Sequence, residues 1–253
     1  MNEANTITRE TKLYGFIAEN AQSDRFAVTL NKRFKTAGDD AMMIPMNIRP
    51  DDFYFTLSNM KKSHVNGAVI APEYQAEATE LLDAASPLCE AVGICDTVLV
   101  NGGRLEGALL VPEALADMVR SLKAERIAIL GASPVAEAML RLLPEREIAL
   151  FDPWIESLMR MQERVGRELD INRLAEGMEA DLGGYDLLFD FSDMPTLAMA
   201  KALPKRNVDL KKPREASALR ERCAELDAVY SGYESLLDRL TEKLYTYLTK
   251  DTV

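Results

Sequence analysis

Short apolar runs alternate with helix-like stretches along most of the chain, and this alternation limits the fold more than any other feature. A buried strand of a parallel sheet is a continuous apolar run, and the helix that leads to the next strand is an amphipathic stretch. The last of these amphipathic stretches, from Tyr233 to Thr249, predicts a helix near the end of the chain. The runs that predict strands include KLYGFIA, AMMIPMNI, GAVIA, RIAILG, EIALFD and YDLLFDFS, with NVDL and DAVYS as shorter ones. The sequence therefore predicts an α/β protein built from parallel βαβ units.

The pattern changes near residues 105–112, and this change predicts two lobes. Before it, the run YQAEATELLDAA is expected to form one helix. The run TVLVNGGRLEGALLV is expected to fold as a β-hairpin, because Asn101 and Gly102 supply the positive φ angles of a tight turn. After it, the helical stretches lengthen, beginning with PEALADMVRSL. We therefore expect one α/β lobe over residues 1–108 and a second over residues 109–232.

Composition and charge exclude several classes of partner. The chain has 253 residues, of which 47% are hydrophobic and 28% charged, as in an ordinary globular protein. Its formal net charge of −11 opposes binding to nucleic acid and to anionic membrane surfaces. No apolar run is long enough to span a membrane, and the first residues lack the basic and apolar segments of an export signal. We expect a cytoplasmic protein whose partner is a small molecule, and the sequence leaves a homodimer open.

The cysteines and the single histidine give no reason to expect a metal site. Cys89, Cys95 and Cys223 are odd in number and form no CxxC motif, so reduced thiols are the natural interpretation. His64 lies in the polar segment KKSHVNG, far from the cysteines in sequence. We therefore expect no metal cofactor.

A glycine turn follows the run RIAILG and resembles part of a dinucleotide-binding turn. In such a Rossmann turn, the first glycine allows a tight bend, the second lets the backbone approach the pyrophosphate, and the third lets helix and strand pack closely. Gly131 meets the first requirement, and Ala136 is small enough for the third. Ser133 places a Cβ where the pyrophosphate comes nearest, and Pro134 removes an anion-binding amide. The turn keeps only part of the dinucleotide pattern.

An acidic residue follows this turn at the spacing expected for ribose recognition. Asp152 ends the run EIALFD, 21 residues after Gly131, where a carboxylate accepts hydrogen bonds from ribose hydroxyls. A carboxylate there repels a 2′-phosphate, so NAD is favoured over NADP as cofactor. The predicted cofactor-binding residues are Gly131, Ala132, Ser133, Asp152 and Phe191.

Two other interpretations of this turn stay open. S-adenosylmethionine offers the same ribose diol but has no pyrophosphate, so it would suit a turn that lacks the second glycine. Alternatively, Gly131 only connects a strand to a helix, and Asp152 only caps the helix that begins at Pro153.

The order of the elements resembles the shikimate dehydrogenase family over roughly Lys12 to Leu248. The segments that carry this resemblance are LYGFIAENAQSDRFAVTLNKRF, VNGAVIAPEYQAEATELLD, AVGICDTVLVNGGRLEG, RIAILGA and SGYESLLDRL. The resemblance implies an N-terminal substrate-binding lobe, a Rossmann-like nucleotide-binding lobe and a last helix, within residues 233–253, that returns to the first lobe. It also implies that the ligand site lies in a cleft between the lobes.

The residues that oxidise shikimate in that family differ in this chain. The catalytic lysine of the family's N-V-T-x-P-x-K signature corresponds to Tyr74, and the aspartate that pairs with it corresponds to Val111. Oxidation of a secondary alcohol by a nicotinamide needs a group that takes the hydroxyl proton. Because both members of the pair are replaced, the resemblance does not extend to activity on shikimate.

Polar and aromatic residues stand at other positions that the resemblance assigns to the substrate. Asp24 and Phe26 replace two serines, Asp96 replaces an asparagine, Arg239 replaces a glutamine, and Thr97 is kept. We interpret Tyr74 and Asp96 as candidate catalytic residues for a different small molecule, aromatic or carboxylated. The candidate substrate contacts are Asp24, Phe26, Thr97 and Arg239. The alternative is that these are ordinary polar residues at the edge of a cleft.

Three functional classes follow from these observations. The first is an NAD-linked oxidoreductase, or a relic of one, that acts on a small molecule other than shikimate. The second is an S-adenosylmethionine-dependent methyltransferase, and the third is a non-catalytic binding protein. We favour the first, because the resemblance covers nearly the whole chain and Asp152 is placed to bind a ribose.

Overall fold

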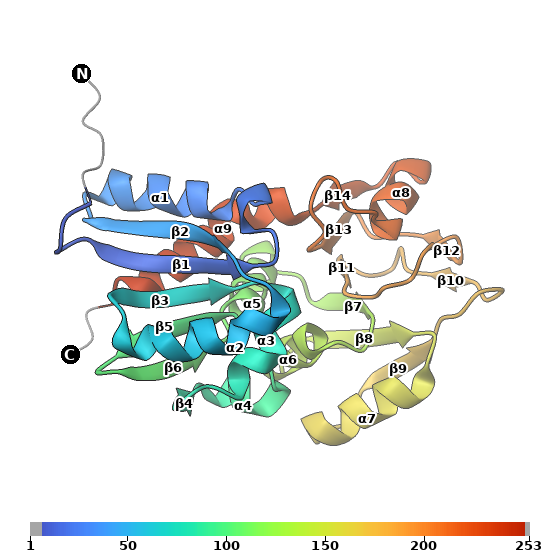
Figure 1. Cartoon of the computed structure of the whole chain (residues 1–253). Helices are drawn as coiled ribbons and strands as arrows, with labels where there is room; N and C mark the ends of the chain where they lie inside the picture. The colour runs from blue at the N-terminus through green and yellow to red at the C-terminus, as the bar shows by residue number, and fades with distance from the viewer. Residues whose placement is uncertain (1–6, 251–253) are drawn as a thin grey trace. The chain divides into compact units, whose positions relative to one another are not determined.

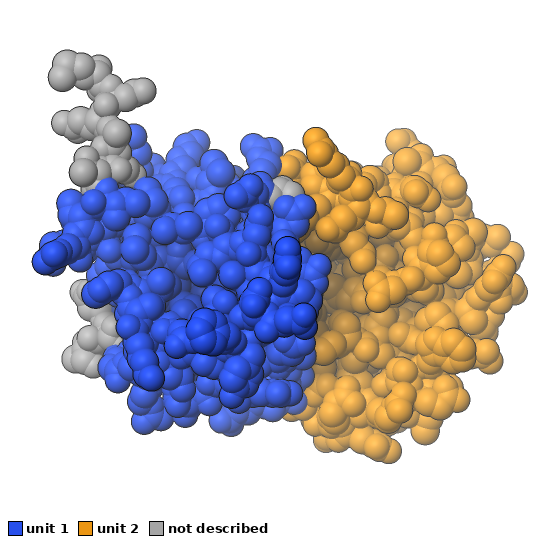
Figure 2. Space-filling view, viewed as in Figure 1, with its two compact units in different colours: residues 1–111, 237–253 blue, residues 112–236 orange. Residues whose placement is uncertain are grey.

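The computed structural model describes residues 7–250, which fold into two compact units (Figure 2). Unit 1 consists of Met1–Val111 and Leu237–Val253, and unit 2 consists of Pro112–Leu236. Each unit is built around its own six-stranded sheet (Figure 1). The predicted α/β class with two lobes is confirmed.

The sheet of unit 1 has the strand order β2-β1-β3-β5-β6-β4. Its strands are β1 (Lys12–Ala18), β2 (Ala41–Asn47), β3 (Val65–Ile70), β4 (Ala84–Ala85), β5 (Thr97–Asn101) and β6 (Arg104–Ala108). β1 is parallel to β2 and β3, whereas β5 is antiparallel to β3 and β6. The start of β5 therefore lies at the same edge of the sheet as the carboxyl ends of β1, β2 and β3.

Helices connect these strands, and the last helix of the chain completes unit 1. They are α1 (Phe26–Ala37), α2 (Pro50–Asn59), α3 (Gln75–Thr79), α4 (Pro87–Val92) and α9 (Tyr233–Leu248), with 3₁₀ turns at Ala21–Ser23, Met60–Lys62 and Pro72–Tyr74. Tyr14 of β1 donates a hydrogen bond to the carbonyl of Leu248 (2.9 Å), and Phe34 of α1 packs against Tyr245. These contacts hold α9 against α1 and β1, as the resemblance implied.

The six-stranded sheet of unit 2 is entirely parallel, in the order β14-β13-β11-β7-β8-β9. Its strands are β7 (Arg126–Leu130), β8 (Glu147–Asp152), β9 (Asp170–Arg173), β11 (Leu187–Asp190), β13 (Arg206–Asp209) and β14 (Val229–Ser231). Counted along the chain within this sheet, the order is 3-2-1-4-5-6, which is the strand order of dinucleotide-binding folds. In such sheets the ligand binds at the carboxyl edge where the strand order reverses. In unit 2 this point lies between β7 and β11.

Four helices and a small second sheet complete unit 2. The elements are α5 (Val111–Leu122), α6 (Pro134–Leu142), α7 (Ile155–Val165), α8 (Ala218–Glu225) and the paired strands β10 (Ala180–Asp181) and β12 (Ala200–Ala202). The apolar residues of the central strands β7 and β11 are all buried, and Leu130, Phe151 and Leu188 belong to one core cluster. Continuous burial of this kind is typical of a parallel sheet that is covered on both faces.

The structure differs from the sequence prediction at two places in unit 1. The run YQAEATELLDAA was expected to be one helix, but α3 ends at Thr79 and the chain then forms β4, which pairs with β6. Asp83 holds this segment to the hairpin, because its carboxylate accepts a hydrogen bond from the amide of Leu105 (2.7 Å). The hairpin is confirmed, but its positive φ angles belong to Gly102 and Gly103 rather than to Asn101.

The described residues contain neither a membrane-spanning helix nor a metal-binding cluster. Within residues 7–250, no helix combines the length and the hydropathy needed to cross a membrane. Within the same range, no three His, Cys, Asp or Glu side chains are grouped so that they could hold a metal ion. The three cysteines are buried free thiols.

Candidate functional site

Gly131 forms the turn between β7 and α6, where the strand order of unit 2 reverses. Its φ angle of +93° lies in the left-handed region, which glycine adopts without steric cost. A Cβ atom at this position would lie 2.7 Å from the amide nitrogen of Ser192 and 2.8 Å from the carbonyl carbon of Phe191. Glycine therefore lets the end of β7 pack directly on the backbone that follows β11.

The amides that follow Gly131 are largely engaged within the protein. The amide of Ala132 donates to Asp152 Oδ2 (2.9 Å), and the amide of Ala136 donates to Ser133 Oγ (3.1 Å). Ser133 is thus the N-cap of α6, and Pro134, the first residue of α6, has no N–H. The turn consequently offers a pyrophosphate fewer amides than a glycine-rich turn does.

Asp152 ends β8 beside this turn, and its side chain is largely buried, with the residue 8% exposed. Oδ2 accepts the amide of Ala132, and Oδ1 accepts the amide of Trp154 (2.8 Å). An ionised carboxylate has about four acceptor positions, so both oxygens keep capacity for a ligand. Helix α7 begins at Ile155 and has no side-chain cap, so the interpretation that Asp152 caps a helix from Pro153 is wrong.

Two further aspartates, which were not predicted from the sequence, lie at the same edge of the sheet. Asp190 ends β11, Asp209 ends β13, and the two residues are direct neighbours in the strand register. Burial raises the pKa of Asp190 to about 6 and the charge of Asp209 adds to the rise, against the hydrogen bonds from Ser192. The signal that could have identified them is an acid that directly ends an apolar run, as Asp152 does.

Asp24 and Phe26 lie at the start of α1, at the carboxyl edge of the sheet in unit 1. Asp24 Oδ1 accepts the amide of Phe26 (2.8 Å) and so closes the turn that leads into the helix. Phe26 is 2% exposed, and its ring packs against Phe16 with 5.7 Å between the centroids. Arg239 comes from α9, and its side chain is exposed. The substrate contacts assigned to these residues stay predictions.

Tyr74 follows β3 at the same edge and is buried. Its ring stacks on Phe53 with 4.5 Å between the centroids, and its hydroxyl donates to the backbone carbonyl of Ile48. Burial raises the pKa of Tyr74, and the carboxylates of Glu19 and Glu73 raise it further. At neutral pH the hydroxyl is therefore a protonated hydrogen-bond donor, which makes it a poor acceptor for a substrate proton.

Asp96 precedes β5 and is 1% exposed. Its carboxylate accepts the amides of Leu110 (2.9 Å) and Val111 (2.7 Å) and the hydroxyl of Thr97 (2.8 Å). Asp96 thus fixes the backbone that leaves β6, and Thr97 is one of its donors. The structure brings Asp24, Phe26, Tyr74, Asp96 and Thr97 to one edge of the sheet in unit 1, with the four polar side chains among them hydrogen-bonded within the unit.

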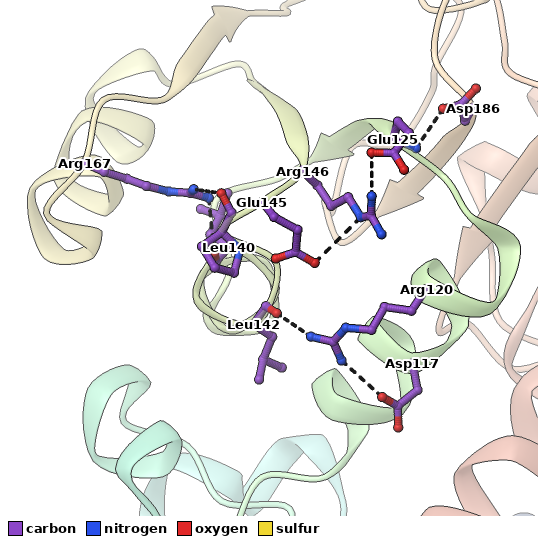
Figure 3. Close-up of polar contacts among 10 residues, drawn as sticks. Asp117, Arg120, Glu125, Leu140, Leu142, Glu145, Arg146, Arg167 and Asp186 are labelled. Carbon is purple, nitrogen blue, oxygen red and sulfur yellow. Dashed lines mark hydrogen bonds and ion pairs between the residues drawn. The ribbon is translucent and has the colours of Figure 1, made fainter.

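A cavity of about 360 Å³ lies at the opposite edge of the sheet in unit 2, where β7, β8 and β9 begin. Arg126, Arg146 and Arg167 contribute to its walls. Figure 3 shows Arg146 beside Glu125 and Glu145, and Arg167 directed at a backbone carbonyl near the end of α6. Arg146 and Arg167 hold the end of α6 to the amino edge of the sheet, and Arg126 pairs with Glu147 and donates to the carbonyl of Gly184. We therefore assign the three arginines a structural role.

Comparisons with known proteins agree with the geometry of both units. No protein-family model matches the chain. The chain is 20% identical over 247 residues to a shikimate dehydrogenase (NADP(+)) of Methanocaldococcus jannaschii, covering 94% of this chain and 85% of the relative. A crystal structure of a shikimate dehydrogenase in complex with NADP+ superposes with a TM-score of 0.78 at 16% identity, covering 98% of this chain and 93% of that chain.

A reductase of another substrate has the same fold. The ligand-free crystal structure of a 5-ketofructose reductase from a Gluconobacter strain superposes with a TM-score of 0.77 at 15% identity, covering 95% of this chain and 94% of that chain. The shared fold therefore does not by itself identify a substrate. In sequence and in fold, at low identity, the chain resembles the shikimate dehydrogenase family.

Proposed function

We propose that the protein is an NAD-linked oxidoreductase, and that unit 2 binds the cofactor at the carboxyl edge of its sheet. The observation that carries this proposal is the parallel sheet with the order of a dinucleotide-binding fold, together with Gly131 at its reversal point. The position of Asp152, one strand away, adds the acid that such folds use to hold a ribose. The relatives named above are a dehydrogenase and a reductase, so nothing in the comparisons favours S-adenosylmethionine.

The cofactor proposed here is NAD, although the name of the curated relative specifies NADP(+). A 2′-phosphate on the adenosine ribose would be placed against the carboxylate of Asp152. Because that carboxylate is largely buried, water screens the repulsion less than it would at the surface. NADP therefore loses affinity at the same position where NAD gains two hydrogen bonds from its ribose diol.

The substrate proposed here is a small alcohol or carbonyl compound other than shikimate. A bound nicotinamide would accept or supply a hydride, and the protein must then move a proton at the oxygen of the substrate. Tyr74, which stands at the position of the family's lysine, holds its proton and donates it to the carbonyl of Ile48. Asp96 is occupied by backbone amides. In the resemblance, the lysine and aspartate that serve shikimate oxidation correspond to Tyr74 and Val111, so this chain has no equivalent of that pair.

Calorimetric titration with NADH and NADPH tests the cofactor. We expect NADH to bind, and NADPH to bind at least about tenfold more weakly. Asp152→Asn keeps the shape of the side chain but removes its charge. It should therefore lower the affinity for NADH and reduce the difference in affinity between NADH and NADPH. Glu156→Gln, an exposed charge in the first turn of α7, is the matched control and should change neither value.

The same samples test the competing interpretations. Binding of S-adenosylhomocysteine without binding of NADH would reject the proposal in favour of a methyltransferase. Binding of neither molecule would favour a non-catalytic protein. Turnover of shikimate with NAD at a rate typical of enzymes would show that our interpretation of Tyr74 is incorrect.

A further inference from the structure

Asp190 occupies a position in unit 2 that mirrors that of Asp152. Both strands that flank β7 end in an aspartate: β8 ends in Asp152 and β11 ends in Asp190. In the register, Leu130 of β7 pairs with Asp190 on one side and with Phe151, the residue before Asp152, on the other. The reversal point of the sheet therefore lies between two carboxylates at the same edge.

The carboxylate of Asp190 is only half satisfied by the protein. Oδ1 accepts both the amide of Ser192 (2.9 Å) and its hydroxyl (2.6 Å). Within residues 7–250, Oδ2 has no hydrogen-bond partner, although the residue is only 7% exposed. Oδ2 is not sealed from solvent, so the hydroxyl of a bound ligand can reach it and donate to its free acceptor positions.

Asp209, the neighbour of Asp190 in the register, shows what a purely structural aspartate looks like at this edge. It is 1% exposed, and both of its oxygens have donors within the protein. Oδ1 accepts the hydroxyl of Tyr230 (2.7 Å) and the amide of Lys211 (3.0 Å), and Oδ2 accepts the hydroxyl of Ser217 (2.6 Å). Asp190 has the same kind of surroundings but lacks the second set of donors.

A dinucleotide supplies those donors. It consists of two nucleotides joined at the pyrophosphate, each with a ribose diol, and it crosses the sheet at the reversal point. With one ribose on the β8 side at Asp152, the other lies on the β11 side. We infer that Oδ2 of Asp190 accepts a hydrogen bond from the ribose on the nicotinamide side of the cofactor. This inference rests on the proposed function and adds a second ribose-binding carboxylate to it.

Partial ligands separate the two carboxylates experimentally. ADP contains only the adenosine ribose, ADP-ribose adds a second ribose, and NADH adds the nicotinamide as well. In the wild-type protein, we expect ADP-ribose and NADH to bind about tenfold or more tightly than ADP, since a hydrogen bond to a buried charge is worth about that factor. This comparison needs no variant.

Asp190→Asn should lower the affinities for ADP-ribose and NADH by about tenfold to a hundredfold and leave the affinity for ADP unchanged. The asparagine oxygen can still accept both hydrogen bonds from Ser192, and its amide group replaces Oδ2. Asp193→Asn is the matched control, because Asp193 lies three residues further on and its side chain is 99% exposed. This control should change none of the three affinities.

Each other outcome rejects a defined part of the proposal. Unchanged affinity of Asp190→Asn for NADH would show that Oδ2 does not contact the second ribose. If Asp190→Asn lowers the affinities for ADP and NADH equally, Asp190 acts only through the turn at Ser192. That result also overturns the inference. If the wild-type protein binds none of the three ligands, the proposed function fails together with the inference.

Discussion

The half-satisfied carboxylate of Asp190 should cost the protein stability, and this cost can be measured without any ligand. The pKa of Asp190 rises from 3.8 to about 6 on folding, chiefly because of burial. The folded state therefore binds the proton of Asp190 more tightly than the unfolded state does. Stability linked to this proton is fully present below about pH 3.8 and is lost as the pH rises through about 6.

Asp190→Asn removes the ionisation and so should stabilise unit 2 at neutral pH. A shift of about two pKa units corresponds to about 3 kcal/mol at pH 7.5, of which about 1 kcal/mol is offset by weaker hydrogen bonds from Ser192 to a neutral acceptor. We expect a net gain of about 2 kcal/mol at pH 7.5. At pH 4 the free-energy cost of ionising Asp190 falls below about 1 kcal/mol, so the stabilisation by Asp190→Asn should disappear.

Urea denaturation followed by circular dichroism, at pH 7.5 and at pH 4, measures the free energy of unfolding of both proteins. Asp193→Asn, the exposed neighbour, controls for the removal of one negative charge and should be neutral within about 0.5 kcal/mol at both pH values. A variant that is less stable than the wild type at pH 7.5, or a difference that does not depend on pH, would refute the reasoning. Either result would mean that a donor satisfies Oδ2 in the folded protein.

Two further substitutions test the turn of unit 2 and the candidate catalytic tyrosine. Gly131→Ala should lower the free energy of unfolding by about 2–4 kcal/mol, because it combines a strained φ angle with a clash against the backbone of Ser192. Urea denaturation measures this change. An unchanged free energy of unfolding would contradict the close packing of β7 on the segment after β11. Tyr74→Phe should cost about 1 kcal/mol, because the carbonyl of Ile48 loses its donor, and it should leave the affinity for NADH unchanged. A fall of more than about a hundredfold in NADH-linked turnover at unchanged stability would instead identify Tyr74 as catalytic.

The residues at the proposed cofactor-binding edge of unit 2 were predictable only where their signal is local. Gly131 and Asp152 stand out because a glycine directly follows one apolar run and an acid ends the next, at a spacing that matches ribose recognition. Asp190 gives a similar local signal, an acid at the end of an apolar run, but a contact with a ligand can only be inferred once its two oxygens are seen to be unequally satisfied. No sequence pattern distinguishes it from Asp209.

The candidate substrate residues of unit 1 also show that a sequence does not reveal the hydrogen-bond partners of a polar side chain. Resemblance placed Tyr74 and Asp96 at functional positions, and both are polar groups that could take part in catalysis. Their hydrogen-bond partners, however, come from distant segments: Ile48 lies 26 residues before Tyr74, and Val111 lies 15 residues after Asp96. Whether a polar side chain serves the fold or a ligand depends on these partners.

The sequence by itself determined the α/β class, the positions of most strands and helices, and the turn at Gly131, because hydrophobic periodicity and glycine turns act over a few neighbouring residues. The tertiary structure alone decided where the helix after Tyr74 ends, since Asp83 and Leu105 bond across the edge of a sheet. It also decided which buried carboxylates are satisfied and which are not. Burial and hydrogen bonding are properties of the assembled fold, so the chemical state of Asp190 exists only once β7, β11 and β13 lie side by side.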